Sequence, residues 1–124
     1  MAPFYIEQEN FLLSVDCIIL GFKKGKLYLL ISKRKFEPLK NQDTLMGGFL
    51  RSDENLEETV SRVLYEYTGI KDVYMEQVGT YGSIHRDEGE RVISVAYYAL
   101  IDLELFDEEL CKKHNARWEE LGKV

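Results

Sequence analysis

The chain has few cysteines, few prolines and no long apolar run. Two cysteines occur in 124 residues, and Cys17 lies within the mostly apolar stretch 15–20. A disulfide framework is therefore excluded, and a reducing cytoplasm is the expected location. The longest uninterrupted apolar stretch, 95–101, is far shorter than the ~20 residues of a membrane-spanning helix. No basic segment followed by an apolar one begins the chain, so we expect neither a secretion signal nor a membrane partner.

The chain also has fewer basic than acidic residues. Sixteen Lys and Arg residues stand against twenty-two Asp and Glu, for a formal net charge of −6. Domains that bind nucleic acid usually carry a basic stripe, which this composition does not favour. The chain by itself is a poor candidate for binding DNA.

What remains is the composition of an ordinary globular domain, with 45% apolar and 31% charged residues. At this length roughly two thirds of the surface of the unfolded chain can be buried, which is enough for one core. We expect a single domain over residues 1–124, of which residues 1–10 form a loose polar arm.

The local patterns predict a mixture of strands and one clear helix. Strand-like runs at 12–22 and 27–32 flank a turn with Gly25, as in a β-hairpin. A loop is expected at 35–44, followed by a short strand at 45–50 with a double glycine. Two further strands are expected at 73–81 and 92–101, with a polar loop at 82–91 between them. The chain then continues into a short helix at 106–113 and a strand that begins at 116–118. This order is typical of an α+β domain with a mixed sheet.

The helix has start and stop signals at both ends. Asn55 can cap it, and Glu58 three residues later completes a capping box. Apolar residues recur at helical spacing, at Leu56, Val60, Val63, Leu64 and Tyr67. Gly69 is the expected C-terminal cap.

Residues 48–70 resemble the box of the Nudix hydrolase family, G-x5-E-x7-R-E-U-x-E-E-x-G-U, where U is aliphatic. Seven of the nine specified positions match, at Gly48, Glu54, Arg62, Leu64, Glu66, Gly69 and Ile70. From average residue usage, a match this good arises by chance in such a chain with a probability on the order of 10⁻⁴. The resemblance implies a Nudix fold, an α/β/α sandwich with a mixed sheet. It also implies that Glu54 and Arg62 tie the loop to the helix and that the glycines serve backbone geometry.

The two positions that fail are metal-binding positions of the family. Three box glutamates hold Mg²⁺ or Mn²⁺ in Nudix enzymes, and two of them are Val63 and Tyr67 here, which leaves Glu66. Metal ions clamp the diphosphate and activate a water in such enzymes, which one carboxylate supports poorly.

No acidic residue stands three or four positions from Glu66, where helix neighbours meet. Glu88 and Glu90, in the expected loop 82–91, are the only plausible donors from elsewhere in the chain. We therefore expect no cofactor, with Mg²⁺ or Mn²⁺ only if the chain is a hydrolase after all.

Three further stretches, 36–38, 86–98 and 114–118, resemble bacterial transcription regulators that carry a degenerate Nudix-like domain. Such regulators sense ADP-ribose-type nucleotides or a sugar such as arabinose, and the similarity is greatest to arabinose-type regulators of the Bacteroides kind. The resemblance implies a homodimer, with the strand 92–101 and the N-terminal arm as candidate surfaces. It implies contact with DNA only through a winged-helix domain absent from this chain. The helix that closes the Nudix fold after Trp118 is also missing, so we expect a truncated C-terminal extension.

The favoured interpretation is a catalytically degenerate, ligand-sensing domain of a transcription regulator. The alternatives are an active Nudix hydrolase of ADP-ribose or another nucleoside-diphosphate-linked substrate, and a dimerisation module without a small ligand. The candidate ligand-binding residues are Arg34, Gly47, Gly48, Arg51, Tyr67, Arg86 and Arg91. Arginines suit a phosphate, whereas tyrosines and carboxylates suit a neutral pentose. Val63 and Tyr67 either form the floor of a metal-free pocket or are ordinary core residues.

Overall fold

The computed structural model describes residues 4–33, 43–84, 91–105 and 116–123. The strands are β1 (Leu12–Lys23), β2 (Lys26–Lys33), β3 (Asp43–Thr44), β4 (Met46–Phe49), β5 (Glu76–Tyr81), β6 (Val92–Asp102) and β7 (Arg117–Lys123). The helices are α1 (Leu56–Thr68) and a short 3₁₀ turn, η1 (Leu103–Leu105). No helix within these ranges is long and apolar enough to cross a membrane.

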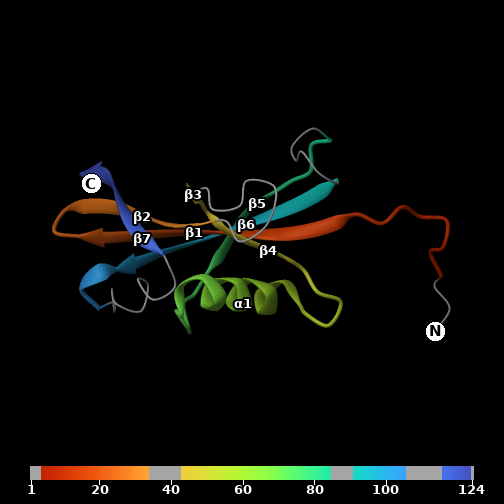
Figure 1. Cartoon of the computed structure of the whole chain (residues 1–124), viewed down its shortest axis with the longest axis horizontal. Helices are drawn as coiled ribbons and strands as arrows, with labels where there is room; N and C mark the ends of the chain where they lie inside the picture. Colours follow the sequence, from red (N-terminus) through yellow and green to blue (C-terminus); the bar gives the residue numbers. More distant parts are fainter. Residues whose placement is uncertain (1–3, 34–42, 85–90, 106–115, 124) are drawn as a thin grey trace.

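β1 organises a mixed sheet, as the sequence predicted (Figure 1). One of its edges pairs in parallel with β6 along eleven residues, from Leu12↔Val92 to Phe22↔Asp102. Its other edge is divided between two antiparallel partners, β4 near the start of β1 and β2 near its end. β5 continues the sheet beyond β6, and β7 pairs with β2.

The predicted hairpin is confirmed, and its turn has the expected chemistry. Only two residues, Lys24 and Gly25, separate β1 from β2, and both have positive φ, 49° and 75°. Two successive left-handed residues match the twist of antiparallel strands, and glycine adopts that conformation without strain.

The helix begins and ends at the predicted residues. The Glu58 carboxylate accepts a hydrogen bond from the Asn55 backbone N–H at 3.0 Å, which is one half of the capping box. At the other end Gly69 has φ 75°, and its N–H donates to the Tyr65 carbonyl at 2.8 Å. These local bonds satisfy backbone groups that a helix leaves unpaired at its ends.

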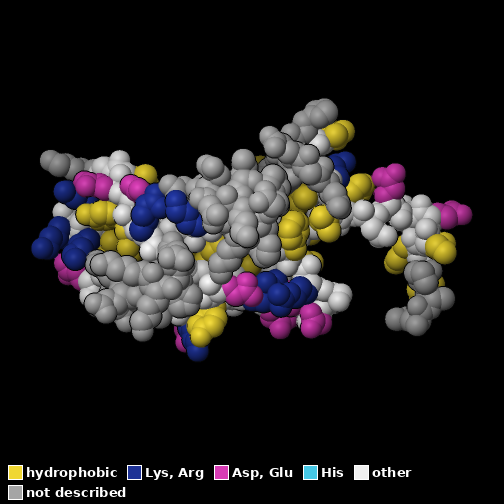
Figure 2. All heavy atoms as spheres, viewed as in Figure 1, with side chains coloured by type: hydrophobic (Ala, Val, Ile, Leu, Met, Phe, Trp, Pro, Cys, Tyr) yellow, Lys and Arg dark blue, Asp and Glu magenta, His cyan; other side chains and the backbone are white. Residues whose placement is uncertain are grey.

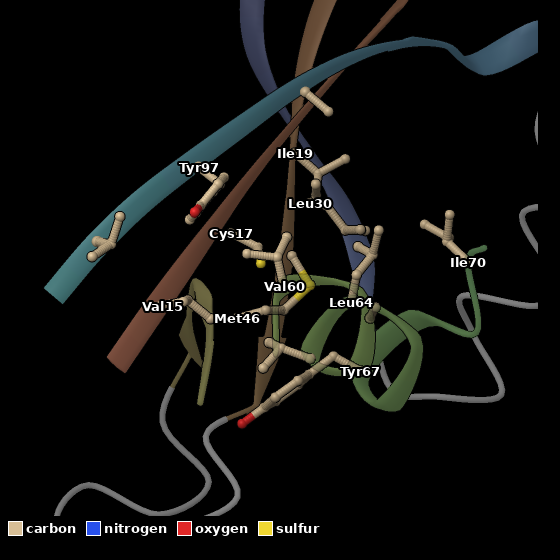
Figure 3. Close-up of a cluster of buried hydrophobic side chains, with 14 residues drawn as sticks. Val15, Cys17, Ile19, Leu30, Met46, Val60, Leu64, Tyr67, Ile70 and Tyr97 are labelled. Carbon is tan, nitrogen blue, oxygen red and sulfur yellow. The ribbon is translucent and has the colours of Figure 1, made fainter. Parts of the chain in front are cut away.

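The core lies between α1 and one face of the sheet (Figure 3). Val15, Cys17 and Ile19 alternate along β1 and have no exposed surface, as alternation along a strand requires. Apolar residues of α1 pack against this face together with buried residues of β6, namely Val95, Tyr97 and Ala99. Burial raises the pKa of the Cys17 thiol to about 12, so Cys17 acts as a core side chain and not as a nucleophile.

The double glycine of β4 is explained by close contacts on both faces of the sheet. A Cβ at Gly48 would lie 2.6 Å from Cγ2 of Val63 on α1, and a Cβ at Gly47 would lie 2.8 Å from Oδ1 of Asp16. Both distances are too short for real atoms. The helix therefore approaches β4 this closely only because the strand carries no side chain there.

Two predicted elements differ from those observed. The strand expected at 73–81 begins only at Glu76, because Val73 and Met75 are partly buried against the core without strand pairing. Their alternating apolar pattern reflects packing under α1. The loop expected at 35–44 ends in the two-residue strand β3, which pairs with β2.

The remaining predicted elements are partly described. The last strand is β7, from Arg117, whereas the helix expected at 106–113 lies outside the described residues. In the described part of the chain α1 is the one α-helix, and it covers one face of the sheet.

Replacing Gly48 tests the fit between β4 and α1. Gly48→Ala is expected to lower the free energy of unfolding by about 1–3 kcal/mol, because the new methyl group overlaps Val63. In the double variant with Val63→Ala the loss should be smaller than the sum of the two single losses, since the overlap is gone. Urea unfolding measures both.

Gly79→Ala is the matched control for this cycle. The nearest atom to its added Cβ is 3.5 Å away, an ordinary contact. We expect a change within about 0.5 kcal/mol. Strictly additive losses for Gly48 and Val63 would contradict the proposed fit.

Candidate functional site

A group of polar side chains in the box joins Glu54 to Arg62. Arg62 donates from Nε to Glu54 Oε2 at 2.7 Å and from Nη2 to Oε1 at 2.9 Å, so the ion pair is bidentate. The same Nη2 donates to the Phe49 carbonyl at 2.8 Å. One guanidinium thus connects β4, the loop after it and α1. This is the structural role that the resemblance implied for the two residues.

Glu54 accepts further hydrogen bonds around this ion pair. The Thr59 hydroxyl donates to Oε1 at 3.0 Å, and the Arg51 backbone N–H donates to the same oxygen at 3.3 Å. The hydrogen bonds from Arg62, above all, hold the pKa of Glu54 at about 2, below its usual 4.5. The pKa of Arg62 is raised in turn by Glu54. Glu54 is therefore a permanent anion and is unsuited to proton transfer near neutral pH.

The positions that hold metal in the family are occupied differently. The side chains of Val63 and Tyr67 are 1% and 4% exposed and belong to the hydrophobic core, which is the second of the two interpretations raised by the sequence. Tyr67 thus packs in the core and does not present a ligand-binding surface (Figure 3). The Glu66 side chain is 44% exposed, and its Oε1 accepts a hydrogen bond from Arg62 Nη1 at 3.5 Å.

These residues do not fit a multi-ion clamp. Within the described ranges no group of three His, Cys, Asp or Glu side chains is arranged to hold a metal ion. Glu88 and Glu90, the acids weighed as substitutes, lie outside the described residues. Of the three metal-binding positions of the box, Glu66 alone carries a carboxylate, and Arg62 already contacts it.

The predicted ligand-binding residues are not all brought together. Arg34 and Arg86 lie outside the described residues. The Arg51 side chain is exposed in the loop beside Glu54. Arg91 lies at the start of β6, where its Nη2 donates to the Gly82 carbonyl at 2.9 Å and its guanidinium stands 5.0 Å from the centre of the Phe11 ring.

The sequence did not reveal a second surface, on the sheet face opposite α1. Ser14 and Ser94 pair across β1 and β6, and their hydroxyls are 2.8 Å apart. Asp16 follows on the same face, beside Gly47 and Ala96. These side chains are small or polar and form a low floor, in which Ser94 is buried at 2% exposure and Ser14 and Asp16 are partly buried.

Aromatic side chains border this floor. Strand register places Phe49 beside Ser14 and Tyr81 beside Ser94, so both share the face with the serines. Their side chains are 46% and 47% exposed. Tyr98, two positions beyond Ala96, is 38% exposed and donates to Glu76 at 3.0 Å, which raises the pKa of the tyrosine.

A small cavity lies elsewhere, between α1 and the segment 70–75. Its volume is about 220 Å³, and its lining includes Val60, Leu64 and Met75. Sites for small molecules usually measure ~300–1,000 Å³, so this cavity is too small for a dinucleotide-sized ligand.

The sequence of residues 10–124 matches the family model described as NUDIX domain. The chain belongs to the Nudix family. One relative of this Nudix chain, the ADPR responsive transcriptional repressor NtrR of Acinetobacter baylyi, is 34% identical over 109 residues, which are 86% of this chain and 44% of the relative. Another, the ADP-ribose pyrophosphatase of Methanocaldococcus jannaschii, is 39% identical over 84 residues, which are 68% of this chain and 47% of the relative.

A solved structure supports the same placement. The NUDIX domain of Shewanella oneidensis NrtR, crystallised with ADP ribose, matches with a TM-score of 0.71 at 33% identity, over 79% of this chain and 65% of that one. The Nudix fold expected from the box is thereby confirmed. The chain spans less than half the length of both curated relatives.

The Arg62–Glu54 pair makes the stability of this Nudix domain depend on pH. A carboxylate with a depressed pKa stabilises the fold fully above its usual pKa of 4.5 and loses that effect as the pH falls toward 2. The difference in unfolding free energy between the wild type and Glu54→Gln is therefore expected to be largest above pH 4.5 and to shrink below it. Urea unfolding at a series of pH values measures it.

Arg62→Lys should raise the pKa of Glu54 toward 4.5, since lysine cannot form the bidentate pair. Carboxyl NMR titration reports this directly. Glu120→Gln, which removes an exposed pair with Lys26, is the matched control and should leave the pH profile unchanged. A Glu54 titration midpoint near 4.5 in the wild type would refute the assignment.

Proposed function

We propose that this Nudix domain binds ADP-ribose or a closely related nucleotide as the sensing part of a transcription regulator, and that it does not hydrolyse the ligand. The observation that carries the proposal is the burial of Val63 and Tyr67 at 1% and 4% exposure. Apolar contacts fill the two positions where the family uses metal-binding carboxylates, while the Arg62–Glu54 pair is intact.

The relatives favour the same ligand class. A repressor responsive to ADP-ribose and a Nudix domain crystallised with ADP ribose are both more than 30% identical to this chain. Ser14 and Asp16, which are partly exposed on the low floor opposite α1, carry hydroxyl and carboxylate groups suited to ribose hydroxyls. The exposed rings of Phe49 and Tyr81 are suited to stacking on a base.

A second candidate function rests on a different relative. The archaeal ADP-ribose pyrophosphatase is 39% identical over two thirds of this chain, and Glu66 remains accessible to solvent. An active hydrolase would need acids from other segments to complete a metal site. Hydrolysis and binding assays separate the two functions.

Binding without turnover is the direct expectation. Calorimetry should detect saturable binding of ADP-ribose, and incubation with Mg²⁺ or Mn²⁺ should release no AMP at enzymatic rates. AMP release that Glu66→Gln abolishes would establish the hydrolase instead. Binding of arabinose in place of ADP-ribose would assign the ligand to the sugar class, and binding of neither would reject the sensor.

Tyr81 tests where the ligand lies. Tyr81→Ala should weaken ADP-ribose binding by up to about tenfold, because an aromatic contact contributes roughly 0.5–1.5 kcal/mol beyond its area. Tyr65→Ala is the matched control, since that ring is also 47% exposed but lies on α1, away from this face. Equal losses in the two variants would place the ligand elsewhere.

DNA recognition and dimerisation belong to the same proposal. Repressors that bind a DNA operator with two-fold symmetry have two-fold symmetry themselves, so a regulator of this kind needs a dimer interface. We assign contact with DNA to residues beyond this chain, because the chain carries a net charge of −6. The Nudix portion is proposed to supply the dimer contact.

A further inference from the structure

The cavity between α1 and the segment 70–75 is an apolar socket. Its apolar lining consists of Val60, Leu64, Tyr65, Ile70, Val73 and Met75. Lys71 stands on its rim, 5.0 Å from the centre of the Tyr65 ring, and Asp72 is its neighbour. A volume of about 220 Å³ suits one or two side chains.

The N-terminal arm carries side chains of matching chemistry. Phe4, Tyr5 and Ile6 are 86%, 78% and 80% exposed, and a turn closed by a 3.0 Å hydrogen bond from the Gln8 N–H to the Tyr5 carbonyl holds this tip together. Figure 2 shows the apolar side chains of the arm standing clear of the body. Three consecutive large apolar residues at such exposure mark a contact surface.

The charges beside the tip and the socket are compatible with such a contact. Glu7 and Glu9 follow the apolar tip, and residues 4–10 contain no basic residue. The socket rim presents Lys71, and its one acidic neighbour is Asp72. A tip inserted into the socket would bring its net negative flank toward a lysine.

The arm is directed away from the socket of its own chain. It leaves the sheet at the start of β1, beyond the N-terminal end of α1, whereas the segment 70–75 follows the C-terminal end of that helix (Figure 1). The tip is therefore placed for a neighbouring molecule.

We propose that the Phe4–Ile6 tip of one copy inserts into the α1 socket of a second copy, and that the exchange is reciprocal. Two such contacts related by a two-fold axis form a closed, isologous dimer. Buried aromatic side chains contribute ~150–250 Å² each, so two tips with their sockets approach the ~1,000 Å² of a specific interface. The inference rests on the proposed dimer contact of the Nudix portion and assigns residues to it, but it does not depend on which ligand the domain binds.

Sedimentation of the whole chain tests the assembly. A dimer is expected at tens of micromolar, and the variant Phe4→Ser/Ile6→Ser should weaken dimerisation at least tenfold. Ser61→Arg, an exposed substitution at the socket edge, should do the same. Leu121→Ser, which alters an equally apolar side chain 55% exposed on β7, should leave the dimer intact. A monomeric wild type, or a dimer unaffected by both the arm and the socket variants, would overturn the proposal.

Cross-linking separates exchange between copies from folding back within one copy. In a Cys111→Ser background, a chain with Ile6→Cys is mixed with a chain carrying Ser61→Cys, and the buried Cys17 is left in place. A disulfide-linked heterodimer should form in the mixture at least about tenfold more than a homodimer in either sample alone. A single chain with both substitutions that closes an internal disulfide at every concentration would show the arm on its own socket, and would overturn the exchange.

Discussion

The bidentate pair between Arg62 and Glu54 fixes the geometry on which the rest of the site depends. Both side chains are largely covered, at 18% and 13% exposure, and the guanidinium also holds the Phe49 carbonyl. Ion pairs of this planar, multiply bonded kind are stronger and more directional than ordinary surface pairs. The end of β4, the loop after it and α1 are thereby held together, which sets how closely the helix approaches the strand.

That close approach explains why the helix face is apolar in this chain. Val63 occupies the space above Gly48, and Tyr67 lies one turn further along the same face. A carboxylate at either position would be removed from water, which is costly unless a metal ion or a cation compensates its charge. Valine and tyrosine instead contribute core area worth roughly 1.5–3 kcal/mol for each fully buried side chain. The Arg62–Glu54 pair and the apolar core are thus compatible with each other without a metal ion.

Features set by neighbouring residues could be predicted from the sequence, and features set by strand pairing could not. The hairpin turn at Gly25 and the caps at Asn55 and Gly69 depend on a few consecutive residues, and the structure has them where expected. The pairing of Ser14 with Ser94 depends on the register of two strands that are eighty positions apart in the chain. A one-residue slip of either strand would turn its hydroxyl to the other face and separate the pair, so no local pattern identified that surface.

The two proposed contacts of the domain meet on β1. The arm, residues 1–10, leads directly into β1, and Ser14, on the face proposed for the ligand, is the third residue of that strand. A ligand influences assembly only through a difference in its affinity for the states that assembly distinguishes. The start of β1 connects the two proposed contacts. It pairs with β4 and β6 beside the proposed ligand, and it also sets the direction in which the arm leaves the sheet. A sensing domain that acts as proposed would transmit occupancy through such a shared element, and among the described strands β1 is the one continuous with the arm.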